Sequence, residues 1–589
     1  MLHSVENNTH LPDEHAVLHR KAVQTHKTNP IQKLIFVREA LFILLDYKIS
    51  RARQESQLLN SAYEHVCKKI AQELESLENP QYKDVLAVIK KVCSKQKLSF
   101  IPRNQSILKY VGHQSAARKL LKVKPVKTAS GVAVIAFMPK PFTCPHGRCI
   151  YCPGGVDVNV PLSYTGAEPC TRYAQRYNFD PYKQIQSKIQ HLYSSGHSLD
   201  KIELVIVGGT FPFFPIEYQR NFVKSSFDAL NNTQSRNLEE SMEMNEKADT
   251  RCVGFTIETK PDYCKTPHVD VMLGLGITRV EIGVQSLQEE TYRIVNRGHN
   301  LLDVIESFQI ARDAGYKIVA HMMPGLPNAT PSKDIEDFQK LFRDPCFRPD
   351  MLKIYPTLVL KDTGLYSLYR RGKYCGYSHE DYIKILIEVK KAVPPWIRIM
   401  RVQREIENKD IVAGPREGNL RQSALRKLKE LGLRCCCIRC REAGLQNRMM
   451  LHDHEIRMNR IDYVASEGKE VFLSFESKDG LSLLGFLRLR DPASPHRPEI
   501  KGQGFSGCGK SAIIRELHVY GVSVDIGCIP GNDSYQHRGY GVKLMQEAER
   551  IVRDEFGLKK ISVISAVGTR EYYRKIGYYR NGPYMTKNL

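Results

Sequence analysis

The sequence predicts an α/β protein of several domains, in which a partial (β/α)6 barrel is joined to a small α+β domain. The chain of 589 residues is too long for a single hydrophobic core. Between residues 129 and 397, short β-branched runs alternate with helical stretches, an order that gives a parallel sheet. From residue 471 to 589, apolar runs alternate with turns and one strong helix interrupts them, which indicates a mixed sheet.

The N-terminal part predicts a polar tail over residues 1–30 and a basic helical region over 31–128. Apolar residues recur at helical spacing in 34–45 and 85–92. Between residues 81 and 130 there are twelve Lys or Arg and one acidic residue, Asp84. A solvated helix face explains only part of this excess, so we expect a surface that binds RNA phosphates. The candidate cations are Lys90, Lys91, Arg118, Lys119, Lys122, Lys124 and Lys127.

The central region contains six strand-and-helix repeats. The predicted strands are 132–138, 204–207, 253–257, 280–284, 318–321 and 352–356. The predicted helices are 216–230, 269–275, 301–314, 334–342 and 380–392. In a barrel, the loops that follow the strands converge on one face. We therefore expect the polar groups after the first four strands to share a pocket: a cysteine loop, Gly208-Gly209-Thr210, Glu258 and Gln285.

The loop after the first strand carries Cys144, Cys149 and Cys152. Four cysteines would close a zinc tetrahedron or saturate a four-iron cluster, whereas three leave one iron able to bind a small molecule. The spacing alone also allows a zinc site completed by His146. In either case the loop is a candidate metal centre.

A basic linker is predicted over residues 398–470, and it holds a second group of cysteines. Cys435, Cys437 and Cys440 have the spacing of a structural zinc site if a fourth ligand joins them. Cys436, His452 or His454 is a candidate for that ligand. The alternative interpretation is a set of free thiols.

In the C-terminal domain, residues 483–489, 513–519 and 561–567 predict strands, and 541–556 predicts a helix. The glycine loop that opens this helix can hold a pyrophosphate on its backbone amides; it consists of Gln536, His537, Arg538, Gly539, Tyr540 and Gly541. Residues 504–511 match the phosphate-binding loop pattern of nucleotide hydrolases. That mechanism requires a following helix, but residues 512–520 predict a strand, so we reject it.

The composition limits the partners and the compartment. A formal charge of +23 indicates a polyanion, with RNA or DNA ahead of an anionic membrane surface. No apolar run approaches the roughly 20 residues that span a bilayer, and residues 1–29 lack a signal-peptide core. We therefore expect a cytoplasmic protein whose sixteen cysteines are thiols or metal ligands.

The three cysteines after strand one and the Gly-Gly motif after strand two resemble the radical S-adenosylmethionine (SAM) superfamily. The resemblance implies a [4Fe-4S] cluster on Cys144, Cys149 and Cys152, with SAM on the fourth iron. It implies SAM contacts from Gly208, Gly209, Thr210, Glu258 and Gln285, with Glu258 also a candidate catalytic residue.

The glycine loop resembles motif A of the Gcn5-related (GNAT) acetyltransferases, which bind acetyl-CoA there. The resemblance places Leu517 and Val519 beside the cofactor. It also places one of two tyrosines, Tyr572 or Tyr573, near the CoA sulfur as a candidate catalytic residue.

The two domains in this order are similar to the catalytic subunit of Elongator over residues 85–589. The segments that carry the similarity are 144–155, 163–166, 207–210, 256–263, 281–286, 296–299, 321–327, 353–357 and 515–521. The short spacing between Cys144 and Cys149 is that of bacterial and archaeal members, which implies a protein that works without the partner subunits of Elongator. A homodimer and an external electron donor are further expectations.

The resemblance implies an enzyme that acts on the anticodon stem-loop of tRNA. A SAM-derived radical and acetyl-CoA would together form 5-carboxymethyluridine at the wobble uridine, position 34. An alternative is a protein lysine acetyltransferase, of the histone type, with a structural iron-sulfur cluster. A non-catalytic RNA-binding protein is a third interpretation, and two intact cofactor loops argue against it.

Overall fold

The computed structural model describes residues 60–589 except 79, 99, 113–114, 446–450, 503–508, 522–523, 525 and 528–533. The predicted tail, the predicted helix at 34–45 and most of segment 504–511 lie outside these residues. The described residues form two compact units, which divide between Lys122 and Val123. Within the described residues, no helix has the length and apolar character needed to cross a membrane.

The first unit is helical, as the sequence predicts. A helix over residues 60–75 precedes α3 (Tyr82–Lys95), α4 (Asn104–Leu108) and α5 (Ala116–Leu121). The buried residues of α3 follow helical spacing, which leaves Lys90 and Lys91 exposed on the opposite side. Lys119 is also exposed, but Arg118 is half-buried and donates hydrogen bonds to the carbonyls of Leu108 and Val111. Arg118 therefore stabilises this unit as well as contributing charge.

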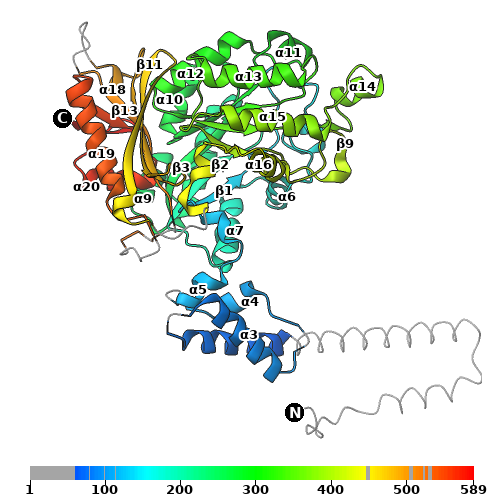
Figure 1. The fold of residues 1–589 in the computed structure, drawn as a ribbon, viewed down its shortest axis with the longest axis vertical. Helices are drawn as coiled ribbons and strands as arrows, with labels where there is room; N and C mark the ends of the chain where they lie inside the picture. Colours follow the sequence, from blue (N-terminus) through cyan, green and yellow to red (C-terminus); the bar gives the residue numbers. More distant parts are fainter. Residues whose placement is uncertain are drawn as a thin grey trace, which may run out of the picture. The chain divides into compact units, whose positions relative to one another are not determined.

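In the second unit, seven parallel strands form one sheet in the order β1-β2-β3-β4-β5-β6-β8 (Figure 1). They are β1 (Ala133–Phe137), β2 (Lys201–Ile206), β3 (Arg251–Thr259), β4 (Arg279–Gln285), β5 (Lys317–Met322), β6 (Met351–Ile354) and β8 (Arg398–Arg401). The first six confirm the predicted strands. The seventh, β8, occupies the start of the predicted linker, so the sheet continues past residue 397.

All five helices that the sequence predicts after the strands form, and α7 (Pro181–Ser194) is one of several further helices. The five are α8 (Ile216–Asn231), α10 (Thr266–Gly274), α12 (Leu301–Asp313), α13 (Pro331–Arg343) and α15 (His379–Ala392). Several of these helices begin at polar residues whose side chains accept a hydrogen bond from the first turn: Asp180, Asn300, Thr330 and Ser378. These caps fix where each helix starts after its loop.

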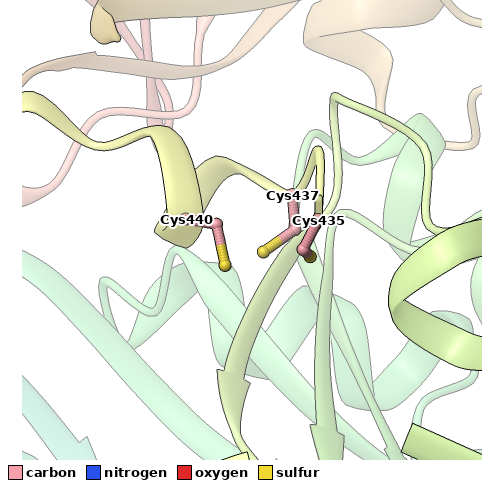
Figure 2. A group of neighbouring side chains, drawn as sticks. All are labelled: Cys435, Cys437 and Cys440. Carbon is pink, nitrogen blue, oxygen red and sulfur yellow. The ribbon is translucent and has the colours of Figure 1, made fainter. Parts of the chain in front are cut away.

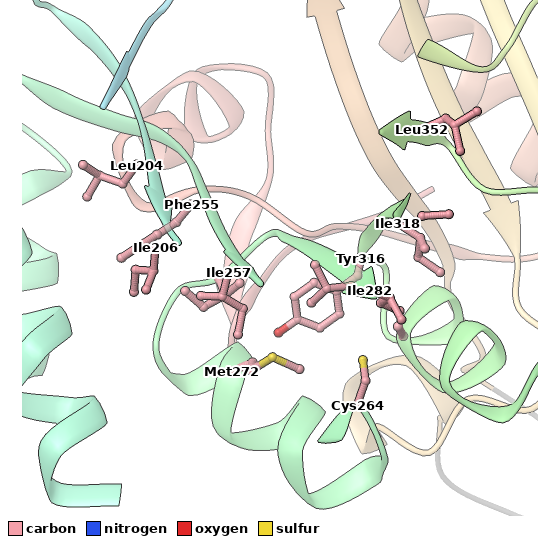
Figure 3. Packing of buried hydrophobic residues seen from close by; sticks show 14 of the residues in the cluster. Leu204, Ile206, Phe255, Ile257, Cys264, Met272, Ile282, Tyr316, Ile318 and Leu352 are labelled. Atoms are coloured by element: carbon pink, nitrogen blue, oxygen red, sulfur yellow. The ribbon is translucent and has the colours of Figure 1, made fainter. Parts of the chain in front are cut away.

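Alternate residues of the parallel strands have different surroundings. Ile206, Ile257, Ile282, Ile318 and Leu352 belong to the main hydrophobic core, and Figure 3 shows this packing. The residues between them face the other side of the sheet and are largely polar; examples are Glu203, Glu258, Glu281, His321 and Lys353. Because side chains alternate along a strand, one face of the sheet builds the core while the other face lines a cavity.

A second sheet has the order β10-β11-β12-β13-β14-β16-β15. Its strands are β10 (Ile456–Ala465), β11 (Gly468–Ser477), β12 (Leu483–Asp491), β13 (Ala512–Val519), β14 (Lys560–Val563), β15 (Tyr579–Asn581) and β16 (Tyr584–Asn588). Only the β13–β14 pair is parallel. β10 and the start of β11 fall within the predicted linker, so this domain begins earlier than residue 471. The strand β13 directly after Ser511 confirms that no hydrolase-type phosphate loop precedes a helix there.

Buried ion pairs join the two sheets. Arg515 on β13 makes two hydrogen bonds of 2.7 Å to the carboxylate of Asp350, which lies just before β6. Arg515 also binds Glu470 at 2.8 Å, and Arg490 on β12 binds Asp313 at 2.7 Å between Nε and Oδ1. These five side chains are at most 1% exposed. The barrel sheet and the second sheet are thus held together by charges that water does not reach.

Candidate active site

The cysteine loop lies after β1 and is held by backbone hydrogen bonds. The amide of Ile150 donates to the carbonyl of Val295 at 3.1 Å, and the amide of Cys152 donates to the carbonyl of Cys149 at 3.0 Å. Cys149 and Cys152 are buried, and Cys144 is half-buried. Burial raises the pKa of the Cys152 thiol to about 11. A metal must therefore displace protons when it binds here.

The three sulfurs of the loop are not gathered as closely as a single ion requires. In a zinc tetrahedron with Zn–S bonds near 2.3 Å, the sulfurs lie about 3.8 Å apart. Among the described residues, Cys144, Cys149 and Cys152 do not form a group whose ligand atoms all lie within 4.8 Å of one another. A preformed single-ion site is therefore not seen here.

His146 contacts the loop as a donor rather than as a ligand. The Nζ atom of Lys260 lies 2.9 Å from Nδ1 of His146, and Nε2 lies 3.2 Å from the sulfur of Cys149. A lysine ammonium only donates, so Nδ1 accepts and Nε2 carries the proton toward the sulfur. Burial, with the charges of Lys260 and Arg297, lowers the pKa of His146 to about 4, which keeps the ring neutral. This geometry rules against the zinc site completed by His146.

We expect the His146→Leu variant to have a lower cluster reduction potential than the wild-type protein. A hydrogen bond to a ligand sulfur stabilises the more negative, reduced cluster. Its loss costs about 1 kcal/mol, or on the order of 40 mV for one electron. A redox titration followed by electron paramagnetic resonance measures the potential. His146→Gln keeps an N–H donor and serves as the control; an unchanged potential in the Leu variant at full iron content would contradict the role.

The residues after β2, β3 and β4 meet near the cysteine loop. Gly208 and Gly209 have φ of +112° and +79°, in the left-handed region that favours glycine. The amide of Gly208 donates to Oε2 of Glu258 at 3.0 Å, and Oγ1 of Thr210 lies 3.9 Å from the sulfur of Cys144. Gln285 also has a positive φ, +74°, and its buried Oε1 has no hydrogen-bond partner in the described structure. The predicted SAM contacts therefore form one cluster around the metal centre.

One cavity of about 790 Å³ connects this cluster with the second sheet. All three loop cysteines, Glu258 and Gln285 line it. So do residues at the amino ends of the barrel strands, such as Glu203, Arg279 and Lys317. On the side of the second sheet it is lined by Leu517, Val563, Ile564, Ser565, Ala566 and Tyr573. We call this space the shared cavity, because both domains contribute to it.

The glycine loop precedes α19 (Tyr540–Arg550), and four predicted residues converge there. A Cβ atom added to Gly541 would lie 3.1 Å from the hydroxyl of Tyr572 and 3.9 Å from both Leu517 and Val519. His537 and Gly539 have positive φ, and the side chains of His537 and Arg538 are exposed. The helix therefore begins beside Tyr572, directly after the exposed residues His537, Arg538 and Gly539.

The two candidate tyrosines lie in different places. Tyr573 is 7% exposed and lines the shared cavity, whereas the hydroxyl of Tyr572 lies against Gly541. Burial raises the pKa of Tyr572 to about 12 and that of Tyr573 further, so both hydroxyls keep their protons at neutral pH. Each can donate a hydrogen bond to a developing thiolate.

Gln536 uses its side chain within the protein. Its Oε1 accepts a hydrogen bond from Nζ of Lys201 at 3.2 Å, and its Nε2 donates to the carbonyl of Val519 at 3.1 Å. Gln536 thus holds the glycine loop against the end of the barrel sheet.

The second group of cysteines has the compact geometry of a single-ion site. The sulfurs of Cys435, Cys437 and Cys440 lie within 4.8 Å of one another, and Figure 2 shows the three side chains. Nζ of Lys390 lies 3.9 Å from the sulfur of Cys435. Cys436 is exposed, and the rings of His452 and His454 stack on each other. In the described structure none of these three joins the group.

The sequence predictions missed a buried charged group on three neighbouring strands. Glu281, His321 and Lys353 lie on β4, β5 and β6 and line the shared cavity. The available signal was a single carboxylate in the apolar run Val280-Glu281-Ile282 and a single lysine in Leu352-Lys353-Ile354. Charged residues inside predicted strands of a buried sheet are unusual enough to mark a site.

Comparisons with known families agree with this architecture. Residues 139–342 match the radical SAM superfamily, residues 349–430 match the Radical_SAM C-terminal domain, and residues 465–578 match the acetyltransferase (GNAT) family. Residues 63–129 match the ELP3 N-terminal domain. The fold and the site thus define a radical SAM enzyme joined to a GNAT acetyltransferase. This class uses a [4Fe-4S] cluster with SAM in one domain and acetyl-CoA in the other.

Relatives extend over most of the chain. Elongator complex protein 3 from Danio rerio is 46% identical over 85% of this chain and 92% of its own length. A tRNA uridine(34) acetyltransferase from Methanocaldococcus infernus is also 46% identical, over 83% of this chain and 92% of its own. The solved structure of archaeal M. infernus Elp3 with an N-terminal deletion has a TM-score of 0.69 at 42% identity, and covers 78% of this chain and 100% of its own. The chain belongs to the Elongator complex protein 3 family.

Proposed function

We propose that this enzyme forms 5-carboxymethyluridine at the wobble uridine of tRNA. The observation that carries the proposal is the shared cavity, which the cluster cysteines and Tyr573 of the acetyltransferase domain line together. One space can therefore hold an acetyl thioester and the metal centre at the same time. Family members named tRNA uridine(34) acetyltransferase support uridine 34 of tRNA as the substrate.

In this reaction Cys144, Cys149 and Cys152 would hold the cluster. When bound, the cluster and SAM would supply the radical chemistry that activates the acetyl methyl group for attachment to carbon 5 of uracil. Gly208, Gly209, Thr210, Glu258 and Gln285 surround the place where SAM would lie. Tyr573 and Tyr572 can each stabilise the sulfur of the thioester by donating a hydrogen bond.

Acetyl-CoA would bind at the start of α19. The backbone amides there carry the positive end of the helix dipole and attract the pyrophosphate of CoA. Leu517, Val519 and Tyr572 surround Gly541 and would contact the pantetheine arm. The thioester then extends toward Tyr573 and the shared cavity.

For tRNA binding we propose the exposed lysines of both units. Lys90, Lys91 and Lys119 are exposed in the first unit, and Lys124 and Lys127 are exposed at the start of the second. Such contacts are strongly weakened by salt. The target base must leave its stack to enter a pocket.

We also propose that Cys435, Cys437 and Cys440 bind zinc. The enzyme would work in the cytoplasm without the partner subunits of Elongator. It would form a homodimer and take its electrons from an external donor.

The function is tested by incubating reduced, cluster-reconstituted protein with SAM, labelled acetyl-CoA and tRNA. We expect label in carboxymethyluridine after nuclease digestion and mass spectrometry. We also expect tRNA affinity to fall steeply as salt rises, because each phosphate contact releases a counterion. Unmodified tRNA that lacks uridine at position 34 is the control. Label on protein lysine without label on uridine would reject the proposal and favour the lysine acetyltransferase.

A further inference from the structure

Three buried polar side chains face the shared cavity from neighbouring strands of the barrel. Glu281 is 1% exposed, His321 8% and Lys353 9%. His321 and Lys353 are directly paired in the register of β5 and β6, and β4 with Glu281 is the neighbour of β5. Nε2 of His321 lies 2.8 Å from Oε2 of Glu281, and Nζ of Lys353 donates to the same oxygen.

This group does not serve packing. Barrel interiors are normally filled by bulky branched side chains, and burying charges costs free energy that apolar residues of similar size would not. Nor does it have the character of a cation site. Although Glu258, Glu281 and His321 place ligand atoms within 4.8 Å of one another, the ammonium of Lys353 already occupies the carboxylate of Glu281. A role in chemistry is the remaining explanation for three polar groups aimed at a reaction cavity.

The contacts determine which nitrogen of His321 carries the proton. Burial alone would raise the pKa of Glu281, but the charge of Lys353 and the hydrogen bond from His321 lower it below its ordinary value. An ionised carboxylate only accepts hydrogen bonds, so Nε2 of His321 is the donor. In the neutral imidazole Nδ1 then holds the lone pair, and it makes no hydrogen bond within the described part of the chain.

The group lies at the cluster end of the cavity. The carboxylate of Glu258, which accepts the hydrogen bond from Gly208, is within 4.8 Å of the ligand atoms of Glu281 and His321. The ring of His321 also packs edge-on against Tyr355, with centroids 5.3 Å apart. His321 is therefore oriented by two neighbours beside the place where carbon is transferred to uracil.

We propose that His321 is the general base that hydrolyses the thioester once its carbon is attached to uridine, with Glu281 as the residue that orients the ring. The proposal rests on the proposed function, because it assigns the last step of that reaction. A water molecule between Nδ1 and the thioester would lose its proton to Nδ1 as its oxygen attacks the carbonyl carbon.

The step balances without an external reactant other than water. The new C–O bond forms, the C–S bond breaks, and the CoA thiolate takes the proton from the imidazolium. The products are the carboxymethyl group, which releases its acid proton to solvent, and free CoA. His321 ends in its starting state. A general base contributes about 10²- to 10⁴-fold to such a step.

The test compares wild-type protein with His321→Gln in the full reaction, quenched with hydroxylamine. Glutamine keeps an N–H donor for Glu281, but its carbonyl is not a base at neutral pH. We expect the variant to form 5′-deoxyadenosine at the wild-type rate and to accumulate uridine that still carries the CoA thioester. Hydroxylamine converts that thioester to a hydroxamate, which mass spectrometry of the digested tRNA detects. Thioester cleavage should slow about 100-fold or more.

A matched control is His268→Gln, on α10 outside the cavity, which should give carboxymethyluridine alone. Glu281→Gln provides a second route if His321→Gln does not fold, and it should also accumulate the hydroxamate. Carboxymethyluridine at the wild-type rate in His321→Gln would overturn the proposal. Loss of 5′-deoxyadenosine in a folded variant would overturn it too, because His321 would then act before hydrolysis. Unlabelled uridine in wild-type protein rejects the proposed function itself, and the inference with it.

Discussion

Replacing Cys149 by alanine should abolish the formation of 5′-deoxyadenosine while acetyl-CoA binding stays at the wild-type level. Cys149 is one of only three sulfurs in the loop, and it receives the hydrogen bond from His146. With two sulfurs the cluster is not held, so SAM has no iron to bind. The acetyl-CoA contacts proposed around Gly541 lie at the start of α19, in the other domain, and they do not depend on the cysteine loop. Chromatography of the nucleoside product and calorimetric titration with acetyl-CoA measure the two effects.

Metal analysis of two variants provides the matched control. Cys149→Ala should lose its iron and keep the zinc proposed at Cys435, Cys437 and Cys440. Cys437→Ser should keep its iron and lose the zinc. Cys437 belongs to the compact group with Cys435 and Cys440 that suits one ion, and this group is separate from the cysteine loop. Iron retained at four atoms per chain in Cys149→Ala, or 5′-deoxyadenosine at the wild-type yield, would contradict the assignment of the cluster.

Replacing Arg515 by methionine should destabilise the second unit by about 3–5 kcal/mol, the usual cost of removing one partner of a buried pair. The variant leaves Asp350 and Glu470 buried without the guanidinium that binds both of them. Differential scanning calorimetry should show a lower unfolding temperature for the barrel and the acetyltransferase domain together, since Arg515 lies between them.

Arg220→Met is the matched control for Arg515→Met. Arg220 pairs with Glu239 at 2.7 Å, but both side chains are exposed, so the expected loss is about 0–1 kcal/mol.

The stability that this network provides should also depend on pH. The charges of Arg515 and Arg488 lower the pKa of Asp350 although burial opposes this. Its stabilisation is therefore present above the ordinary pKa of aspartate and is lost as pH falls toward the lowered value. Equal unfolding temperatures for Arg515→Met and wild type at neutral pH would show that the network adds no stability.

The barrel strands could be predicted because β-branched runs and capped helices alternate along the chain. Several other strands could not, among them β8 and β10. β8 contains only Ile399 and Met400 between two arginines, so its sequence lacks the apolar run that would predict a buried strand. β10 has no continuous apolar face, and most of its residues are half-buried or exposed. Both lie where pairing with a neighbouring strand, rather than local pattern, determines the structure.

The metal centre could be predicted from spacing, because the three cysteines are close in sequence. The residues that tune and surround it could not. Lys260 reaches His146 across 114 positions, and Lys353 reaches Glu281 across 72. Contacts of this kind depend on how parallel strands come together, and no local pattern encodes them. The same applies to Gln536, whose side chain is held by Lys201 from the start of β2.

The buried arginines between the two sheets also have a consequence for how such a chain can change during evolution. A domain that packs through apolar residues can be recombined with new partners, because almost any apolar face will cover it. Here separation of the two sheets would break the pairs that Asp350 and Asp313 make with Arg515 and Arg490. A new partner for either sheet would have to offer charges in matching positions, and a substitution at this seam affects both domains at once.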